Sequence, residues 1–320
     1  MGMDSVPSLG ELLRDSPKNW GVWGPDDECG ALNYLTSELV IAGARTVRQG
    51  KVFTLQLPMG HAHGDPLWPG REPMARTVSL DESSWTSGDG PDFPGGLHYA
   101  DDTICTNTQG STQYDALGHV WHDGLIYNGY SAETTIGGLS RASVAAIADR
   151  GVVGRGVLLD MARYFGVDFL EPGATFNHHD LLSAAEAQGV TIRERDILLI
   201  RTGWLEFWYQ TTPDEFYGNF LEPGLTYSPE LVTWFAEMQI PNLVTDTMGN
   251  EVTIDPVSGV ALPLHNALMR NLGIAFGEMC RLGELASDCA ADGQWDFLYV
   301  AAPLHLLQGA GAPVNPVAIK

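Results

Sequence analysis

A short run of polar residues, from Gln109 to His119, carries the side chains of this sequence that are best suited to chemistry. Alternate side chains of an extended strand share a face, so positions 109, 111, 113 and 115 would lie together, and His119 follows four residues later. The oxygens of Gln113 and Asp115 with the imidazole of His119 are suitable ligands for Mn²⁺ or Zn²⁺. The alternative is a Gly-rich turn whose polar side chains bond the local backbone.

This run resembles the metal-binding segment of the cyclase family, which includes bacterial kynurenine formamidase and isatin hydrolase and has the pattern H-x-G-T-H-x-D-x-P-x-H. Thr112, Asp115 and His119 match the threonine, the aspartate and the last histidine of that pattern. Gln109 and Gln113 stand where the family has its first and central histidines. The resemblance implies a metal site of Gln113, Asp115 and His119. An amide oxygen binds a divalent ion more weakly than an imidazole does, so the sequence leaves open whether the ion is Mn²⁺ or Zn²⁺ and how strongly it is held.

Two further positions extend the resemblance. His265, at the start of an expected helix, and Glu278, on the next expected strand, are similar to a second pair of polar residues in the family. The resemblance implies catalytic roles for His119, His265 and Glu278. The alternative is a helix-capping histidine and a surface glutamate.

The resemblance continues at both ends of the chain, from Trp20 to an A-P-L…G-x-G-x-P-V-N-P ending at Pro316. It implies a small-molecule substrate, cyclic or aromatic. Aromatic rings pack well against flat molecules. The candidates for binding the substrate are Gln109, Trp23, Trp68 and Trp121.

Strands and helices alternate along the sequence, which favours a mixed α/β fold. Expected strands are 52–57, 156–160 and 242–246, and expected helices include 177–188, with Gly189 as its stop, and 263–271. The resemblance implies the swivelling β/β/α type of fold, with a curved sheet or partial barrel flanked by helices, and a homodimer or homotetramer.

No change in composition divides the chain, so we expect one domain over residues 1–320 with an N-terminal arm of about 1–50. Residues 58–99 are rich in Gly, Pro, His and Trp. We expect them to form a long loop, and loops of this length inside compact enzymes usually have a function.

The formal net charge of −23 argues against nucleic acid and anionic membranes as partners, because both need clustered Lys and Arg. The four cysteines have no C-x-x-C spacing, which excludes a zinc ribbon. No stretch approaches the ~20 apolar residues of a membrane span. The N-terminus has no signal-peptide pattern, so the expected location is cytoplasmic.

The leading functional hypothesis is a metal-dependent hydrolase that opens a cyclic amide, or cleaves a formamide or lactone, by a metal-activated water. One alternative is a metal-independent cyclase, dehydratase or isomerase that uses His119 and Glu278 for acid–base chemistry. Another is a ligand-binding relative without catalysis. The convergence of several ionisable groups weighs against the last of these.

Overall fold

The computed structural model describes residues 6–61, 63–218 and 220–320 and is built on a curled nine-stranded sheet. Its four central strands, β5, β7, β9 and β10, run parallel, and the strands on either side of them pair antiparallel. In sheet order the strands are β1 (Val52–Thr54), β13 (Val317–Ile319), β11 (Asp296–Ala301), β5 (Val152–Asp160), β7 (Ile197–Arg201), β9 (Asn242–Thr245), β10 (Ala275–Glu278), β4 (Gln113–Asp115) and β12 (Gly311–Pro313).

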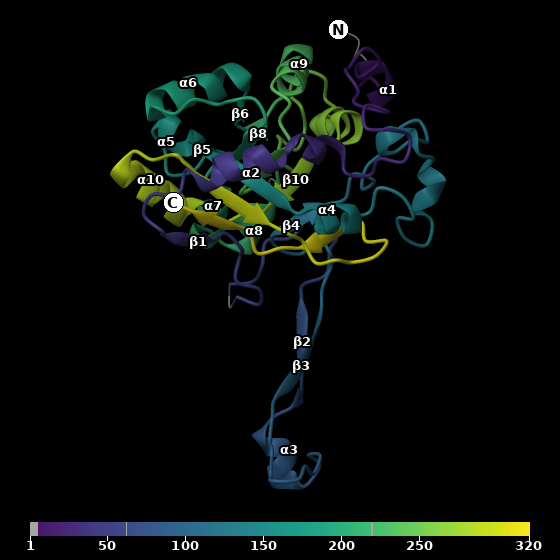
Figure 1. Cartoon of the computed structure of the whole chain (residues 1–320), viewed down its shortest axis with the longest axis vertical. Coiled ribbons are helices and arrows are strands. Elements are labelled where there is room, and N and C mark those ends of the chain that lie inside the picture. Colours follow the sequence, from purple (N-terminus) through teal and green to yellow (C-terminus); the bar gives the residue numbers. More distant parts are fainter. Residues whose placement is uncertain (1–5, 62, 219) are drawn as a thin grey trace.

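Helices cover both faces of this sheet (Figure 1). The α-helices are α1 (Leu9–Leu12), α2 (Ser37–Ala44), α3 (Glu82–Ser87), α4 (Val144–Arg150), α5 (Met161–Phe165), α6 (His178–Gln188), α7 (Trp204–Gln210), α8 (Pro213–Gly218), α9 (Pro229–Glu237) and α10 (Gly283–Asp292). The other helices are the 3₁₀ turns η1 (Gly30–Tyr34), η2 (Tyr127–Gly129) and η3 (Ala132–Thr135) and the π-helix η4 (His265–Asn271). Two short strands, β6 (Thr175–Phe176) and β8 (Gly224–Leu225), pair apart from the main sheet.

The central strands are buried on both faces, which explains their continuous apolar sequences. Leu198 and Ile200 of β7 belong to one core cluster together with side chains of α6, α9 and η4. Ile197 and Leu199 of the same strand belong to a second cluster together with side chains of α4 and α10. The sheet therefore separates two cores, and its parallel strands all end at one edge.

These observations confirm the expected fold class, a mixed α/β structure with a curled sheet flanked by helices. The expected helix at 177–188 is α6, where Asn177 and Asp180 form a capping box and Gly189 ends the helix in the left-handed conformation. The helix expected at 263–271 is also present, but its hydrogen bonds are those of a π-helix over His265–Asn271. π-helical turns occur frequently at functional sites.

The N-terminal segment packs against the end of η4. The indole of Trp20 donates a hydrogen bond to the Arg270 carbonyl, 2.8 Å, and lies under the Arg270 guanidinium. The Ala31 N–H donates a hydrogen bond to the Gly273 carbonyl at 2.8 Å. The two backbones approach closely here, because a Cβ on Gly273 would lie only 2.7 Å from the Cα of Gly30. The segment thus fixes the helix that carries His265.

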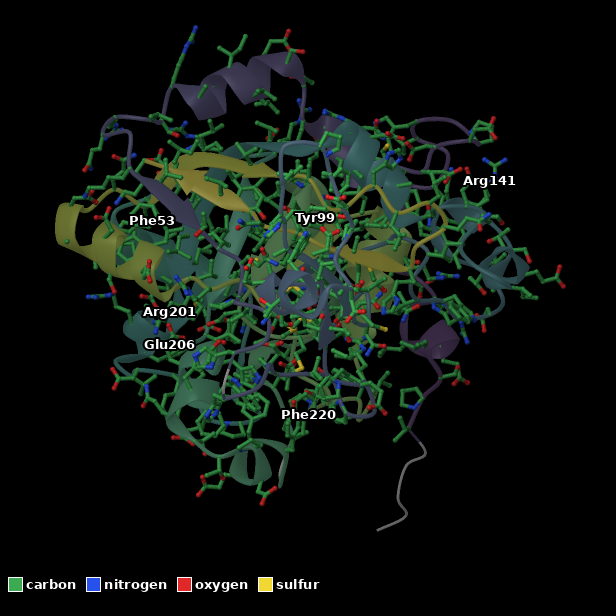
Figure 2. The ribbon with its side chains drawn as sticks, turned by 90° about the horizontal axis from the view of Figure 1, so that it is seen from below. Phe53, Tyr99, Arg141, Arg201, Glu206 and Phe220 are labelled. Atoms are coloured by element: carbon green, nitrogen blue, oxygen red, sulfur yellow. The ribbon has the colours of Figure 1, made fainter. Side chains whose placement is uncertain are left out.

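The prediction of a long loop over 58–99 is wrong from residue 75 onward, where the chain enters an ordered hairpin that extends to residue 105. Strand β2 (Ala75–Leu80) pairs antiparallel with β3 (Asp101–Cys105), and α3 lies between them at the tip. Figure 1 shows this hairpin projecting far from the rest of the chain, and Figure 2 views the molecule from that side. The strands lack an apolar face because no core lies beneath them, so their sequence did not indicate strands.

Among the described residues, no helix has both the length and the apolar composition that crossing a membrane requires.

Candidate functional site

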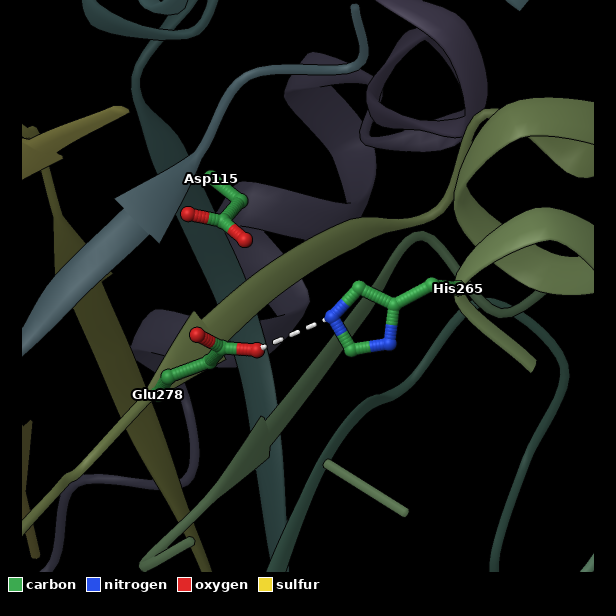
Figure 3. A group of neighbouring side chains, drawn as sticks. All are labelled: Asp115, His265 and Glu278. Atoms are coloured by element: carbon green, nitrogen blue, oxygen red, sulfur yellow. Dashed lines mark ion pairs between the residues drawn. The ribbon is translucent and has the colours of Figure 1, made fainter. Parts of the chain in front are cut away.

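Three ionisable side chains converge at the edge of the sheet where the parallel strands end. Asp115 comes from the end of β4, Glu278 from the end of β10, and His265 from the start of η4. One potential ligand atom from each lies within 4.8 Å of the others, and all three residues are buried (Figure 3). The carboxyl ends of the parallel strands in α/β sheets are the usual place for polar site residues.

The register of two strands determines which side chains meet here. Strand β4 pairs antiparallel with β10 and places Gln113 directly opposite Glu278. Opposite residues of an antiparallel pair project from the same face, and so does the residue two positions along. Gln113, Asp115 and Glu278 therefore share one face of the sheet, and His265 approaches that face from the helix above it.

Glu251 holds the imidazole of His265. The Nδ1 atom of His265 lies 2.8 Å from Oε1 of Glu251, and the two carboxylate oxygens also accept the backbone N–H groups of Leu264 and His265, each at 2.7 Å. A carboxylate at Nδ1 selects the tautomer with a proton on that nitrogen. The Nε2 atom is thereby directed at Glu278, whose Oε1 is 3.5 Å away.

The cluster concentrates negative charge among buried side chains. Burial, followed by the nearby Asp115 carboxylate, raises the pKa of Glu278 to about 7. Burial lowers the pKa of His265, but hydrogen bonds to Glu251 and Glu278 outweigh this and raise the pKa to about 10. These carboxylates therefore strongly favour a positive charge at the centre of the cluster.

The donor atoms of the cluster fit a divalent ion. In the part of the chain that the structure describes, Oδ1 of Asp115, Oε1 of Gln113 and Oδ1 of Asn250 are buried without a hydrogen-bond partner. Buried polar atoms are normally paired, and unpaired ones often mark a missing ion or water. Two carboxylates and one imidazole form a set that suits Mn²⁺ and is acceptable to Zn²⁺.

His119 stands beside this cluster rather than within it. Its Nε2 atom lies 3.5 Å from Oδ2 of Asp115, and 26% of its side chain is exposed. Burial lowers the pKa of His119 below its ordinary value, although Asp115 opposes the shift. The lowered pKa favours the neutral ring, which has a nitrogen that can accept a proton.

Gln113 and Gln109 differ in their surroundings. The amide of Gln113 donates a hydrogen bond from Nε2 to Oε2 of Glu278 at 2.6 Å. Gln109 is buried, and its backbone carbonyl oxygen accepts a hydrogen bond from the Arg71 guanidinium at 2.8 Å. A Cβ on Gly311 would lie 2.6 Å from Nε2 of Gln109, so the glycine makes room for this side chain.

The three tryptophans proposed to bind substrate lie in different settings. Trp23 packs edge-on against Tyr34, with ring centroids 5.0 Å apart. Trp68 packs edge-on against Phe220 at 5.4 Å, within an aromatic cluster that also contains Met279, the residue after Glu278. Trp121 is 47% exposed.

A cavity of about 710 Å³ lies apart from the cluster, because neither Asp115, His265 nor Glu278 lines it. Its lining contains Arg201 and Glu206, which form an ion pair at 3.3 Å and lie side by side in Figure 2. It also contains Arg281 and Glu284, which pair at 3.0 Å. The four charged groups named here pair with each other, whereas buried oxygens of the cluster lack partners among the described residues.

The sequence did not indicate four polar residues near the cluster: Arg71, Glu222, Asn250 and Glu251. Asn250 donates a hydrogen bond to Oε1 of Glu278, 3.0 Å. Glu222 is fully buried, and a Cβ on Gly249 would lie within 4 Å of both Glu222 and His265. Burial raises the pKa of Glu222 to about 8. These residues lie in loops with no spacing pattern, so only the folded path of the chain brings them here.

Comparisons with known proteins identify the family of the chain. A model of the cyclase family matches residues 52–252. The crystal structure of a novel cyclase is 35% identical to the chain, with a TM-score of 0.86, and the match covers 95% of this chain and 100% of that one. No curated protein gives a significant match.

Isatin hydrolases share the fold at lower identity. Isatin hydrolase A from Labrenzia aggregata bound to benzyl benzoate is 18% identical with a TM-score of 0.58, over 90% of this chain and 98% of that one. An isatin hydrolase bound to the product analogue thioisatinate is 17% identical with a TM-score of 0.60, over 91% and 97%. With the family model over residues 52–252 and the cyclase structure at 35% identity, the chain belongs to the cyclase family.

Proposed function

We propose that this protein is a hydrolase that opens a cyclic amide, or cleaves a formamide or lactone, with a divalent ion bound by Asp115, His265 and Glu278. The observation that carries the proposal is the convergence of these three buried side chains within 4.8 Å, next to buried oxygens that lack partners among the described residues. Membership of a family with hydrolase-like structural neighbours supports it.

A divalent ion in this position would lower the pKa of water and polarise a carbonyl group. Asp115, His265 and Glu278 provide its ligands, and Glu251 keeps the His265 ring in position. His119, neutral and beside Asp115, accepts a proton from the attacking water as the new bond from oxygen to the carbonyl carbon forms. The same imidazole then returns the proton to the departing nitrogen or oxygen as that bond breaks.

The substrate class is a compact carbonyl compound, cyclic or aromatic. Two isatin hydrolase neighbours hold benzyl benzoate and thioisatinate, and both are small aromatic carbonyl compounds. We assign Gln109, Trp23, Trp68 and Trp121 as candidates for packing or orienting such a molecule. We also propose a homodimer or homotetramer, which light scattering of the purified protein tests.

The first test combines metal analysis with a substrate panel. Protein purified without added metal should contain close to one Mn²⁺ or Zn²⁺ per chain by mass spectrometry, and it should hydrolyse a member of a panel of isatins, aryl formamides and lactones. Removal of the metal, or Asp115→Ala, should lower kcat/KM at least about 100-fold, because losing a ligand costs more than losing a group that supports one.

Glu237→Ala removes an exposed carboxylate on α9 and provides the matched control, with unchanged activity expected. Activity that survives complete metal removal contradicts the proposal. It would favour the metal-independent cyclase, dehydratase or isomerase that relies on His119 and Glu278.

A further inference from the structure

Two carboxamide side chains from distant parts of the chain donate hydrogen bonds to the same carboxylate. Nε2 of Gln113 lies 2.6 Å from Oε2 of Glu278, and Nδ2 of Asn250 lies 3.0 Å from Oε1. Gln113 belongs to β4, whereas Asn250 lies in the loop between β9 and η4. Each oxygen of Glu278 is therefore held by one amide.

These contacts are shielded from water. Gln113, Asn250 and Glu278 are 0%, 2% and 1% exposed. Burial destabilises an ionised carboxylate that has no hydrogen-bond donors. Each amide hydrogen bond therefore stabilises the ionised form of Glu278. Hydrogen bonds to an ionised acceptor are also the shorter and stronger ones, which agrees with the 2.6 Å contact.

The charge of Glu278 fixes which way both amides face. A reversed amide would place its own oxygen against a carboxylate oxygen, and two acceptors repel each other. In the observed orientation, Oε1 of Gln113 and Oδ1 of Asn250 have no partner within the described ranges 6–61, 63–218 and 220–320. The N–H group of each amide is thus committed to Glu278.

We propose that Gln113 and Asn250 are positioning residues that hold the Glu278 carboxylate for the ion, and that Gln113 is not itself a ligand. Carboxylates that bind metals are themselves held by hydrogen bonds from groups that do not touch the ion. One lone pair on each Glu278 oxygen accepts an amide N–H, which leaves the others for the ion. The inference rests on the proposed function, in that it needs an ion at Asp115, His265 and Glu278. It assigns Gln113 a role different from the ligand role that the family pattern implied.

The test measures Mn²⁺ binding by calorimetry and by the loss of the free-ion electron paramagnetic resonance signal, without reference to activity. Gln113→Leu and Asn250→Leu each remove one donor and should weaken Mn²⁺ binding about 10–100-fold, the usual effect of losing a group that supports a ligand. Gln294→Leu is the matched control. It removes a buried amide that bonds Thr46 and Asp296 instead, so Mn²⁺ affinity should not change.

A crystal structure of the wild-type protein with Mn²⁺, located by anomalous scattering, shows whether Gln113 positions Glu278 or binds the ion itself. This test does not depend on how well the variants fold. We expect Nε2 of Gln113 to remain hydrogen-bonded to Glu278, with Oε1 well beyond the metal–oxygen bond length of about 2.0–2.6 Å that hard cations show. Direct coordination by Gln113, or unchanged affinity in both leucine variants, overturns the inference alone. Absence of any Mn²⁺ or Zn²⁺ binding by the wild-type protein overturns the proposed function and this inference together.

Discussion

Glu251 orients the imidazole ring of His265. It accepts the ring N–H at Nδ1 and two backbone N–H groups at the start of η4, so one carboxylate both orients the imidazole and caps the helix. A neutral amide at this position cannot accept all three hydrogen bonds, since its –NH₂ group would face another donor. The orientation of His265 should therefore be sensitive to the charge at position 251.

We predict that Glu251→Gln weakens Mn²⁺ binding about 10–100-fold, because it loosens a metal-binding histidine without removing it. Calorimetric titration of Mn²⁺ checks this, with thermal unfolding measured on the same samples. Glu237→Gln alters an exposed carboxylate and should bind Mn²⁺ like the wild type. Equal affinities for the Glu251→Gln variant and the wild type would show that backbone packing alone orients His265.

At the level of residues, the sequence pointed to Asp115, His265 and Glu278, which the structure brings together. Asp115 was indicated by its type and its spacing within one expected strand, whereas His265 and Glu278 were implied by the resemblance to the cyclase family. The partners of Glu278 could not be predicted. Asn250 lies in the irregular loop between β9 and η4, and its contact with Glu278 depends on how that loop folds across the sheet.

At the level of elements, the sequence predicted strands and helices by their periodicity but gave no strand order. Strand β4 is only three residues long and lies between β10 and β12, although these three are distant in the sequence. Pairing between distant strands depends on the packing of the whole molecule, which local patterns do not record. The register that sets Gln113 opposite Glu278 was therefore visible only in the structure.

Lys320 joins the sheet to a helix directly after β13. Its side chain is fully buried, and its Nζ atom bonds Asp288 at 2.7 Å and both oxygens of Asp292 at 2.9 Å, all from α10. Burial raises the pKa of Asp292, but hydrogen bonds, led by the one from Lys320, outweigh this and lower the pKa to about 2. The ionised form of Asp292 is thus favoured in the folded state.

We predict that Lys320→Met lowers the free energy of unfolding at pH 7 by about 1–3 kcal/mol, because it leaves two partly buried carboxylates without their shared donor. The pKa of Asp292 is lower in the folded state than its ordinary value of 3.8. The stability from this contact is therefore complete above about pH 4 and is lost as the pH falls towards 2. Urea denaturation at pH 7 and at several values between 4 and 2 measures both effects.

The difference between Lys320→Met and the wild type should shrink as the pH falls through this range. Lys51→Met is a useful comparison, because Lys51 contacts Asp288 at 2.6 Å but its side chain is 46% exposed, so its loss should cost less. Equal denaturation midpoints for Lys320→Met and the wild type at pH 7 would contradict the assigned role.

At the level of the whole molecule, the projecting hairpin is the part of the fold that differs most from expectation. The strand residues of β2 and β3 are exposed apart from Leu80, which is half-buried. Apolar side chains such as Val78 and Ile104 are more than 50% exposed. A two-stranded ribbon has no core of its own and is marginally stable alone. The hairpin therefore contributes little apolar burial to the nine-stranded sheet and its helices.

The hairpin can be removed with little disturbance to its base, because Ala75 and Cys105 are directly paired. We predict that replacing residues 76–104 with Asn-Gly, a two-residue turn suited to hairpins, changes the free energy of unfolding by no more than about 0.5 kcal/mol. Urea denaturation followed by tryptophan fluorescence and circular dichroism measures this. Arg71 and Gln109 remain in the shortened chain, so Mn²⁺ affinity should also be kept. A clear loss of stability or of metal binding would show that the hairpin supports the site through contacts that a single isolated chain does not make.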